Sequence, residues 1–196
     1  MRTKNLQHFI EQVRACHLCQ AELPYGARPV FQMSRSSKIL IAGQAPGKKV
    51  HATGIPFDDP SGDRLRKWVG LEKDAFYDAR KIAILPMGFC YPGTGQSGDL
   101  PPLKKCAEQW REKLLSFMTD IELVLVIGKY AMDWHIGTDQ KSNLTETVKA
   151  WQDYRDMGIM PLPHPSPRNN IWLKKNAWFE KDVVPQLQKD IADIIA

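Results

Sequence analysis

Residues 38–47 read Lys38-Ile39-Leu40-Ile41-Ala42-Gly43-Gln44-Ala45-Pro46-Gly47. The first half is a short apolar run, which predicts a buried strand over residues 38–42. The second half is a Gly/Pro turn that ends this strand. Because open α/β sheets bind ligands at the carboxyl ends of their strands, this turn is where we first expect a binding site.

Three further apolar runs have the length and composition of buried strands, at residues 81–87, 122–127 and 157–162. Apolar residues recur at helical spacing in four segments, at residues 1–14, 63–70, 101–118 and about 177–195. Strands that alternate with helices predict a three-layer α/β/α fold around a central, mainly parallel, four-stranded sheet. Since the sequence shows no repeat or linker, we expect one domain over residues 1–196.

The composition, 43% hydrophobic and 25% charged, is that of a soluble globular protein. The sequence contains no apolar run of about 18 residues that could span a membrane, and its N-terminus has no signal-peptide core. We therefore expect a cytoplasmic protein, with a monomer as the simplest assembly. The formal net charge of +5 favours a polyanionic partner such as nucleic acid, although many mildly basic proteins bind none.

The cysteines form a close pair, Cys16 and Cys19, followed much later by Cys90 and Cys106. Thiols in the cytosol stay reduced, so a disulfide framework is not expected. Four thiolates suit a tetrahedral zinc ion or an iron–sulfur cluster, and the spacing alone does not choose between them. The competing interpretation is four unrelated buried cysteines, which the tight pair makes less favourable.

A second loop follows the last predicted strand and reads His164-Pro165-Ser166-Pro167-Arg168-Asn169-Asn170. The prolines around His164 stiffen the backbone and hold the imidazole in one direction. This suits a hydrogen bond to an anionic leaving group, although a histidine that only caps a loop is the commoner case. Phe57, ten residues beyond the first turn, is either a core residue or a stacking platform for a flat base.

Taken together, these residues resemble the uracil-DNA glycosylase superfamily. Residues 43–47 are similar to its water-activating loop, and residues 54–65 are similar to the segment that follows that loop. Residues 164–169 are similar to its second motif, and their sequence is closest to that of the single-strand-selective branch. The resemblance implies that Phe57 stacks on the base and that His164 stabilises the departing base anion. The cysteine spacing resembles the branch that carries a [4Fe–4S] cluster, which implies that Cys16, Cys19, Cys90 and Cys106 are its ligands, with zinc as the alternative.

The same resemblance implies a DNA partner that carries a damaged base. We expect the loop at Ser166, Arg168 and Asn169 to contact DNA phosphates and enter the minor groove, and Lys48 and Lys49 to add non-specific attraction.

Two departures from the family pattern concern catalysis and specificity. Ala45 stands where the most efficient branch has an aspartate, and Gln44 where the iron–sulfur branch has a glutamate. The asparagine that reads uracil should fall near Pro86-Met87, where the sequence has none. We therefore place the base contacts at Ala45, Phe57 and the backbone of Met87 and Gly88, or else the specificity differs.

The sequence thus predicts a DNA glycosylase that hydrolyses the N-glycosidic bond of uracil or another deaminated base. His164, as a neutral donor, and Gln44, which positions the attacking water, are the predicted catalytic residues. Three carboxylates could replace the missing acid, although each is more commonly a solvated or helix-capping group: Asp58, Asp59 and Asp63. The alternative is a weak or inactive base-binding protein on the same fold, and an iron–sulfur electron carrier ranks below it because no ferredoxin spacing is present.

Overall fold

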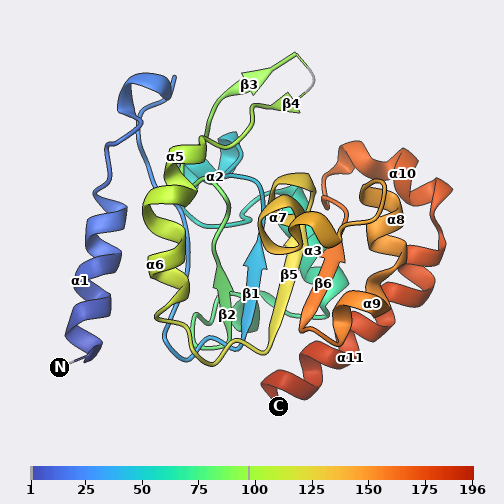
Figure 1. The fold of residues 1–196 in the computed structure, drawn as a ribbon. Helices are drawn as coiled ribbons and strands as arrows, with labels where there is room; N and C mark the ends of the chain where they lie inside the picture. Colours follow the sequence, from blue (N-terminus) through green and yellow to red (C-terminus); the bar gives the residue numbers. More distant parts are fainter. Residues whose placement is uncertain (1, 97) are drawn as a thin grey trace.

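Four parallel strands form the central sheet, in the order β2-β1-β5-β6 (Figure 1). The protein is described from a computed structural model that covers residues 2–96 and 98–196, so Met1 of the predicted first helix lies outside the described residues. The strands are β1 (Ile39–Ala42), β2 (Ile82–Ile84), β5 (Leu123–Ile127) and β6 (Ile159–Leu162). Every pairing between them is parallel, which confirms the predicted sheet.

The strand order reverses beside β1. The chain runs from β1 to β2 on one side, then returns past β1 to place β5 and β6 on the other. Such a reversal leaves a crevice outside the carboxyl ends of the strands, where ligands bind in this class of sheet. The loops that follow β1, β2 and β6 all emerge at this edge.

Helices cover both faces of the sheet and confirm the three-layer arrangement (Figure 1). Ile39 and Ile41 of β1 join a core with α3 (Pro60–Val69), η5 (Phe179–Val183) and α11 (Val184–Ile195). Leu40 points to the other face, because side chains alternate along a strand, and joins a core with α1 (Arg2–Arg14) and α6 (Glu112–Leu115). The remaining helices are α2 (Lys48–Thr53), α4 (Lys73–Phe76), α5 (Lys104–Cys106), η2 (Ala107–Arg111), α7 (Lys129–His135), α8 (Leu144–Lys149), α9 (Trp151–Arg155) and α10 (Asn170–Lys175), with short 3-10 turns η1 (Gln20–Glu22), η3 (Gly137–Asp139) and η4 (Pro167–Asn169).

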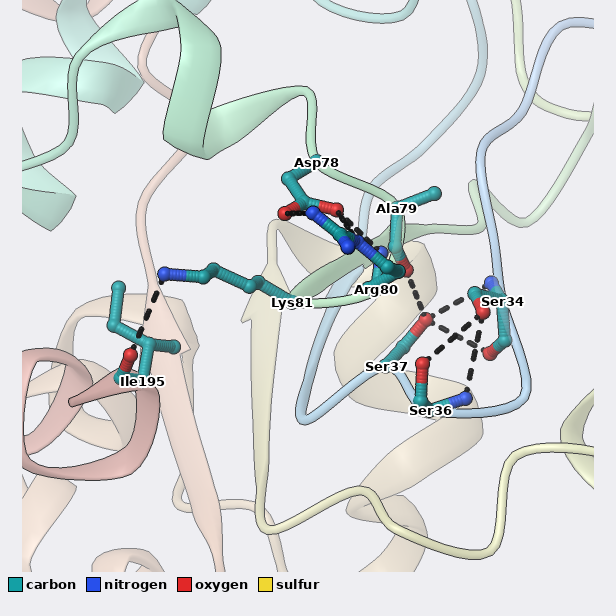
Figure 2. Close-up of polar contacts among 8 residues, drawn as sticks. All are labelled: Ser34, Ser36, Ser37, Asp78, Ala79, Arg80, Lys81 and Ile195. Atoms are coloured by element: carbon teal, nitrogen blue, oxygen red, sulfur yellow. Dashed lines mark hydrogen bonds and ion pairs between the residues drawn. The ribbon is translucent and has the colours of Figure 1, made fainter.

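The opposite, amino-terminal edge of the sheet is closed by a serine-rich turn (Figure 2). The hydroxyl of the fully buried Ser37 accepts from the Ser34 amide at 2.9 Å and lies 2.7 Å from the Ala79 carbonyl. This joins the segment that enters β1 to the segment that enters β2. Lys81 reaches the Ile195 carbonyl at 3.5 Å and ties the end of α11 to the same edge.

Several predicted elements have different limits in the structure. The predicted helix over residues 101–118 begins at Lys104, after the extended residue Leu103, and it contains the π-helical segment η2. The predicted strand over residues 81–87 is shorter, because β2 ends at Ile84; the Leu85 amide still donates to Ile41 of β1, and the Met87 amide donates to Gly43 in the loop after β1. An antiparallel hairpin of β3 (Thr94–Gly95) and β4 (Gly98–Asp99) was not predicted. Across the described residues, no helix is long and apolar enough to cross a membrane.

Candidate active site

A cavity of about 240 Å³ lies at the carboxyl edge of the sheet. Its wall combines the loop after β1, the end of β2, the loop after β6, residues 56–61 and one residue of β4. Seven residues singled out from the sequence line this one cavity: Gln44, Ala45, Phe57, Asp59, His164, Ser166 and Arg168. The structure therefore brings the two predicted loops and the aromatic ring to one place.

Backbone hydrogen bonds hold the loop after β1 against the end of β2. The Met87 amide donates to the Gly43 carbonyl at 2.8 Å, and the Gly88 amide donates to the Gln44 carbonyl at 3.0 Å. We expected the backbone of Met87 and Gly88 to contact the base, but these N–H groups are used within the protein and neither residue lines the cavity. Pro86 lines it instead.

The side chain of Gln44 is fixed by the hairpin. Its Nε2 donates to the Leu100 carbonyl at 3.0 Å, one residue beyond β4. Because the amide nitrogen is used there, Oε1 remains as the acceptor that Gln44 can offer to a ligand or a water molecule. The hairpin is thus attached directly to the first loop.

Phe57 is held in a strained backbone conformation. Its φ of 54° makes it the one non-glycine residue with positive φ in the described part of the chain, and such strain gathers at functional sites. The Phe57 carbonyl accepts from the Arg66 guanidinium at 3.3 Å and lies so close to Gly62 that a Cβ there would be 1.7 Å away. The ring packs edge-on against Phe76 of the core and also lines the cavity, so Phe57 fits both interpretations of its role.

Of the three candidate carboxylates near α3, one lines the cavity. Asp59 caps α3, where its Oδ1 accepts from the Gly62 amide at 2.8 Å, and it also faces the cavity. Asp63 forms an ion pair with the buried Arg66. Asp58 and Asp63 do not line the cavity, which leaves Asp59 as the candidate from this segment.

His164 is held as a neutral hydrogen-bond donor. Burial lowers its pKa, an effect that Asp59 and Asp99 partly oppose. Its Nδ1 accepts from the Ser166 amide at 3.2 Å. A neutral imidazole has one protonated nitrogen, so this contact places the proton on Nε2. The ring can therefore donate a hydrogen bond without bringing a positive charge.

Two side chains hold the histidine loop in place, one from within the loop and one from α3. The Asn169 amide donates to the His164 carbonyl at 2.7 Å, so this predicted DNA-binding side chain also supports the loop. Arg64 of α3 donates to the Ser166 carbonyl at 3.0 Å and to Asn170 Oδ1 at 2.6 Å. No local pattern pointed to Arg64, because the contact joins segments about one hundred residues apart.

The predicted DNA-contacting cations are exposed, and one of them, Arg168, lines the cavity. A Cβ at Gly98 would lie 2.5 Å from the Arg168 Nη1, so its guanidinium rests on the hairpin. Lys48 and Lys49 begin α2 and are exposed, and the Lys48 ammonium lies 5.6 Å from the centre of the Tyr25 ring.

The four cysteines line a second cavity, beside the first helix and η2. Cys16, Cys19, Cys90 and Cys106 all contribute to its wall. Across the described residues, no three His, Cys, Asp or Glu side chains converge on a point that would hold a single metal ion.

The chemistry of these thiols fits ligands of a cationic group. Burial raises the pKa of Cys90 to about 11 and that of Cys106 to about 12, and the neighbouring cysteines add to both shifts. Such thiols stay protonated unless a positive charge among them offsets the cost of ionisation. Two sulfurs already accept protein hydrogen bonds, Cys106 from the Phe89 amide at 3.2 Å and Cys16 from the Trp110 indole at 3.3 Å.

One comparison with known proteins bears on this arrangement. A family model described as the uracil DNA glycosylase superfamily matches residues 31–188. The match includes both loops of the cavity, Phe57, Cys90 and Cys106, and it begins after the pair Cys16 and Cys19. It therefore covers most of the chain and every residue of the cavity wall except Val30.

Proposed function

Because the chain belongs to the uracil-DNA glycosylase superfamily, we propose that it hydrolyses the N-glycosidic bond of uracil or another deaminated base in DNA. One observation carries the proposal: Gln44, Phe57 and His164 line the same cavity. An enzyme that cuts a base from DNA must take it out of the stack and enclose it in a pocket. A volume of about 240 Å³ is smaller than the roughly 300–1,000 Å³ typical for drug-sized ligands, which suits a single base.

In the proposed reaction, His164 stabilises the leaving base. Cleavage of the glycosidic bond leaves negative charge on the base, and the Nε2–H of a neutral His164 is a donor for the base oxygen that carries it. A preorganised donor of this kind contributes about 3–4 kcal/mol to transition-state stabilisation. Because the Ser166 amide fixes the ring, this donor needs no reorganisation during the reaction.

Phe57 and Gln44 complete the binding of the reactants. The Phe57 ring lies against the core on one side and offers a surface on which a flat base can stack. The Gln44 Oε1, held by the contact of Nε2 with Leu100, accepts a hydrogen bond from water or from the base. Arg168, Lys48 and Lys49 then attract the DNA phosphates around the cavity mouth.

The experiment is a panel of oligonucleotides, each with one deaminated base (uracil, hypoxanthine or xanthine), in single- and double-stranded form. We expect an abasic site from at least one of them, and a fall of roughly 100-fold or more in the single-turnover rate for His164→Ala. His8→Ala changes an exposed histidine on α1 and serves as the matched control. Binding without excision across the whole panel would favour a base-binding protein, the function that Ala45 supports.

For the second cavity, we propose a [4Fe–4S] cluster held by Cys16, Cys19, Cys90 and Cys106. When bound, it would supply a cross-link between the segment after α1 and the segment from Cys90 to α5, and such metal binding contributes directly to folding. The test is the visible absorption of the purified protein, together with its iron and acid-labile sulfide content, in wild type and Cys90→Ala. A colourless wild type with one equivalent of zinc would replace the cluster with the zinc alternative.

A further inference from the structure

The attacking water needs a partner that the loop after β1 does not offer. Hydrolysis is faster when a positioned group holds the water and accepts its proton, an effect typically of 10²–10⁴-fold. Ala45 has no such group, and Gln44 can hold water but cannot take its proton. A carboxylate from another part of the chain would fill this role.

Asp99 brings a carboxylate to the cavity from the hairpin. It lies in β4 and lines the same cavity as Gln44 and His164. Its Oδ2 would be 3.4 Å from a Cβ at Gly47, so it lies directly over the end of the first loop. The Asp99 carboxylate also lies close enough to His164 to oppose the lowering of its pKa by burial. Asp99 therefore faces both loops that form the site.

The rest of the hairpin holds this carboxylate in place. Thr94 Oγ1 donates to Asp99 Oδ1 at 3.5 Å and is itself in contact with the hydroxyl of the fully buried Tyr91. One residue after Asp99, the Leu100 carbonyl accepts from Gln44. One residue before it, Gly98 lies beneath Arg168 of the histidine loop. The backbone around Asp99 is thus anchored on both loops, while Oδ2 faces the cavity.

Asp59, the other carboxylate of the cavity, is less suited to move a proton. Its Oδ1 accepts from the Gly62 amide at 2.8 Å and caps α3. This contact commits one of the two carboxylate oxygens to the helix and holds the side chain there. Asp99 carries no such helix cap.

We propose that Asp99 is a catalytic residue that binds the attacking water and accepts its proton, and this rests on the proposed glycosylase function. The bond between the sugar C1′ and the base nitrogen breaks, and its electron pair leaves with the base, whose anion is stabilised by His164. The water oxygen forms a bond to C1′ and its proton passes to Asp99 and then to solvent. A proton from solvent neutralises the base, so the products are an abasic sugar and a free base.

The test is Asp99→Asn, which keeps the size of the side chain and its contact with Thr94 but cannot accept the proton. Using the base that the wild type excises fastest, we expect a fall of about 100-fold or more in the single-turnover rate. Binding to DNA with a non-cleavable analogue should be retained or slightly tighter, because the variant removes a negative charge from a basic surface. Asp74→Asn, an exposed carboxylate on α4 outside the cavity, is the matched control.

The outcomes separate this proposal from the one on which it rests. A wild type that excises a base while Asp99→Asn remains within about threefold of its rate overturns the role of Asp99 and leaves the glycosylase intact. If Asp59→Asn alone loses the rate, Asp59 holds the water and Asp99 does not. A wild type that excises no base from the panel overturns both proposals.

Discussion

Gly62→Ala sets helix propensity against a steric contact at the site. Gly62 is the third residue of α3, where alanine is favoured over glycine by about 1 kcal/mol. However, a Cβ at this position would lie 1.7 Å from the Phe57 carbonyl oxygen, and real Cβ atoms do not approach within 3.0 Å. The carbonyl must therefore move by at least 1.3 Å, the difference between these two distances.

That movement has a calculable cost. The Phe57 carbonyl accepts from the buried Arg66 at 3.3 Å, and loss of a charged hydrogen bond costs about 1.5–3 kcal/mol. Forcing an extra methyl group into packed surroundings lowers the stability by about 1–3 kcal/mol more. After subtracting the gain in propensity, we expect the free energy of unfolding to fall by about 1.5–5 kcal/mol. At roughly 2–4 °C for each kcal/mol, the Tm should fall by about 3–20 °C.

Thermal unfolding followed by circular dichroism measures this shift, and single-turnover excision measures its effect on the site. Because the change displaces Phe57, the excision rate should fall even at temperatures where the variant is folded. Gly137→Ala is the control, since a Cβ there meets nothing within 4 Å and only its φ of 60° opposes the change. A Gly62→Ala protein as stable as the wild type would refute the reasoning, because propensity would then outweigh the contact.

Two further predictions concern buried titratable groups. Because burial lowers the pKa of His164, the ring stays neutral as the pH falls from neutral to the ordinary histidine value of 6.5. The excision rate should therefore stay level over this range. A midpoint near 6.5 in the pH–rate profile would contradict this prediction. Arg111 is fully buried and donates to the Leu85 and Pro86 carbonyls, and its Nη2 lies 2.8 Å from His135 Nε2. Arg111→Met removes these contacts and should lower the free energy of unfolding, measured in urea, by about 3 kcal/mol. The same variant should raise the pKa of His135, which burial and the positive charge of Arg111 together lower to about 3, as followed by NMR titration of the ring; an unchanged titration would show that Arg111 does not act on it.

The parts of the fold that depend on local pattern could be predicted from the sequence. The run Ile39–Ala42 is apolar on both faces of the sheet, as a central parallel strand must be, and the Gly/Pro turn after it ends the strand where expected. The start of α3 could also have been placed more accurately. Asp59 is a favourable N-cap and Pro60 a favourable first residue, and both signals precede the predicted start at residue 63.

The hairpin of β3 and β4 could not be predicted in the same way. Its strands are two residues each, half of them glycine, and none of these residues is buried, so they carry no hydrophobic alternation. Its position depends on contacts with distant segments, chiefly the Gln44 side chain and Arg168. The sequence around Asp99 therefore reads as a polar loop, and its place in the cavity becomes visible only in three dimensions.

This difference changes what the alanine in the first loop means. A motif describes only the groups that one segment contributes, whereas a cavity collects groups from every segment that reaches the same edge of the sheet. The carboxyl edge gathers the loops after three parallel strands, and the hairpin bonded to the first loop adds an acidic side chain to the same space. A carboxylate of the kind that Ala45 fails to supply is thus present in the same cavity, on an element attached to Gln44, the residue next to Ala45. Ala45 alone is therefore weak evidence for an inactive protein, because catalysis requires a carboxylate at the right point in space rather than at a given position in the motif.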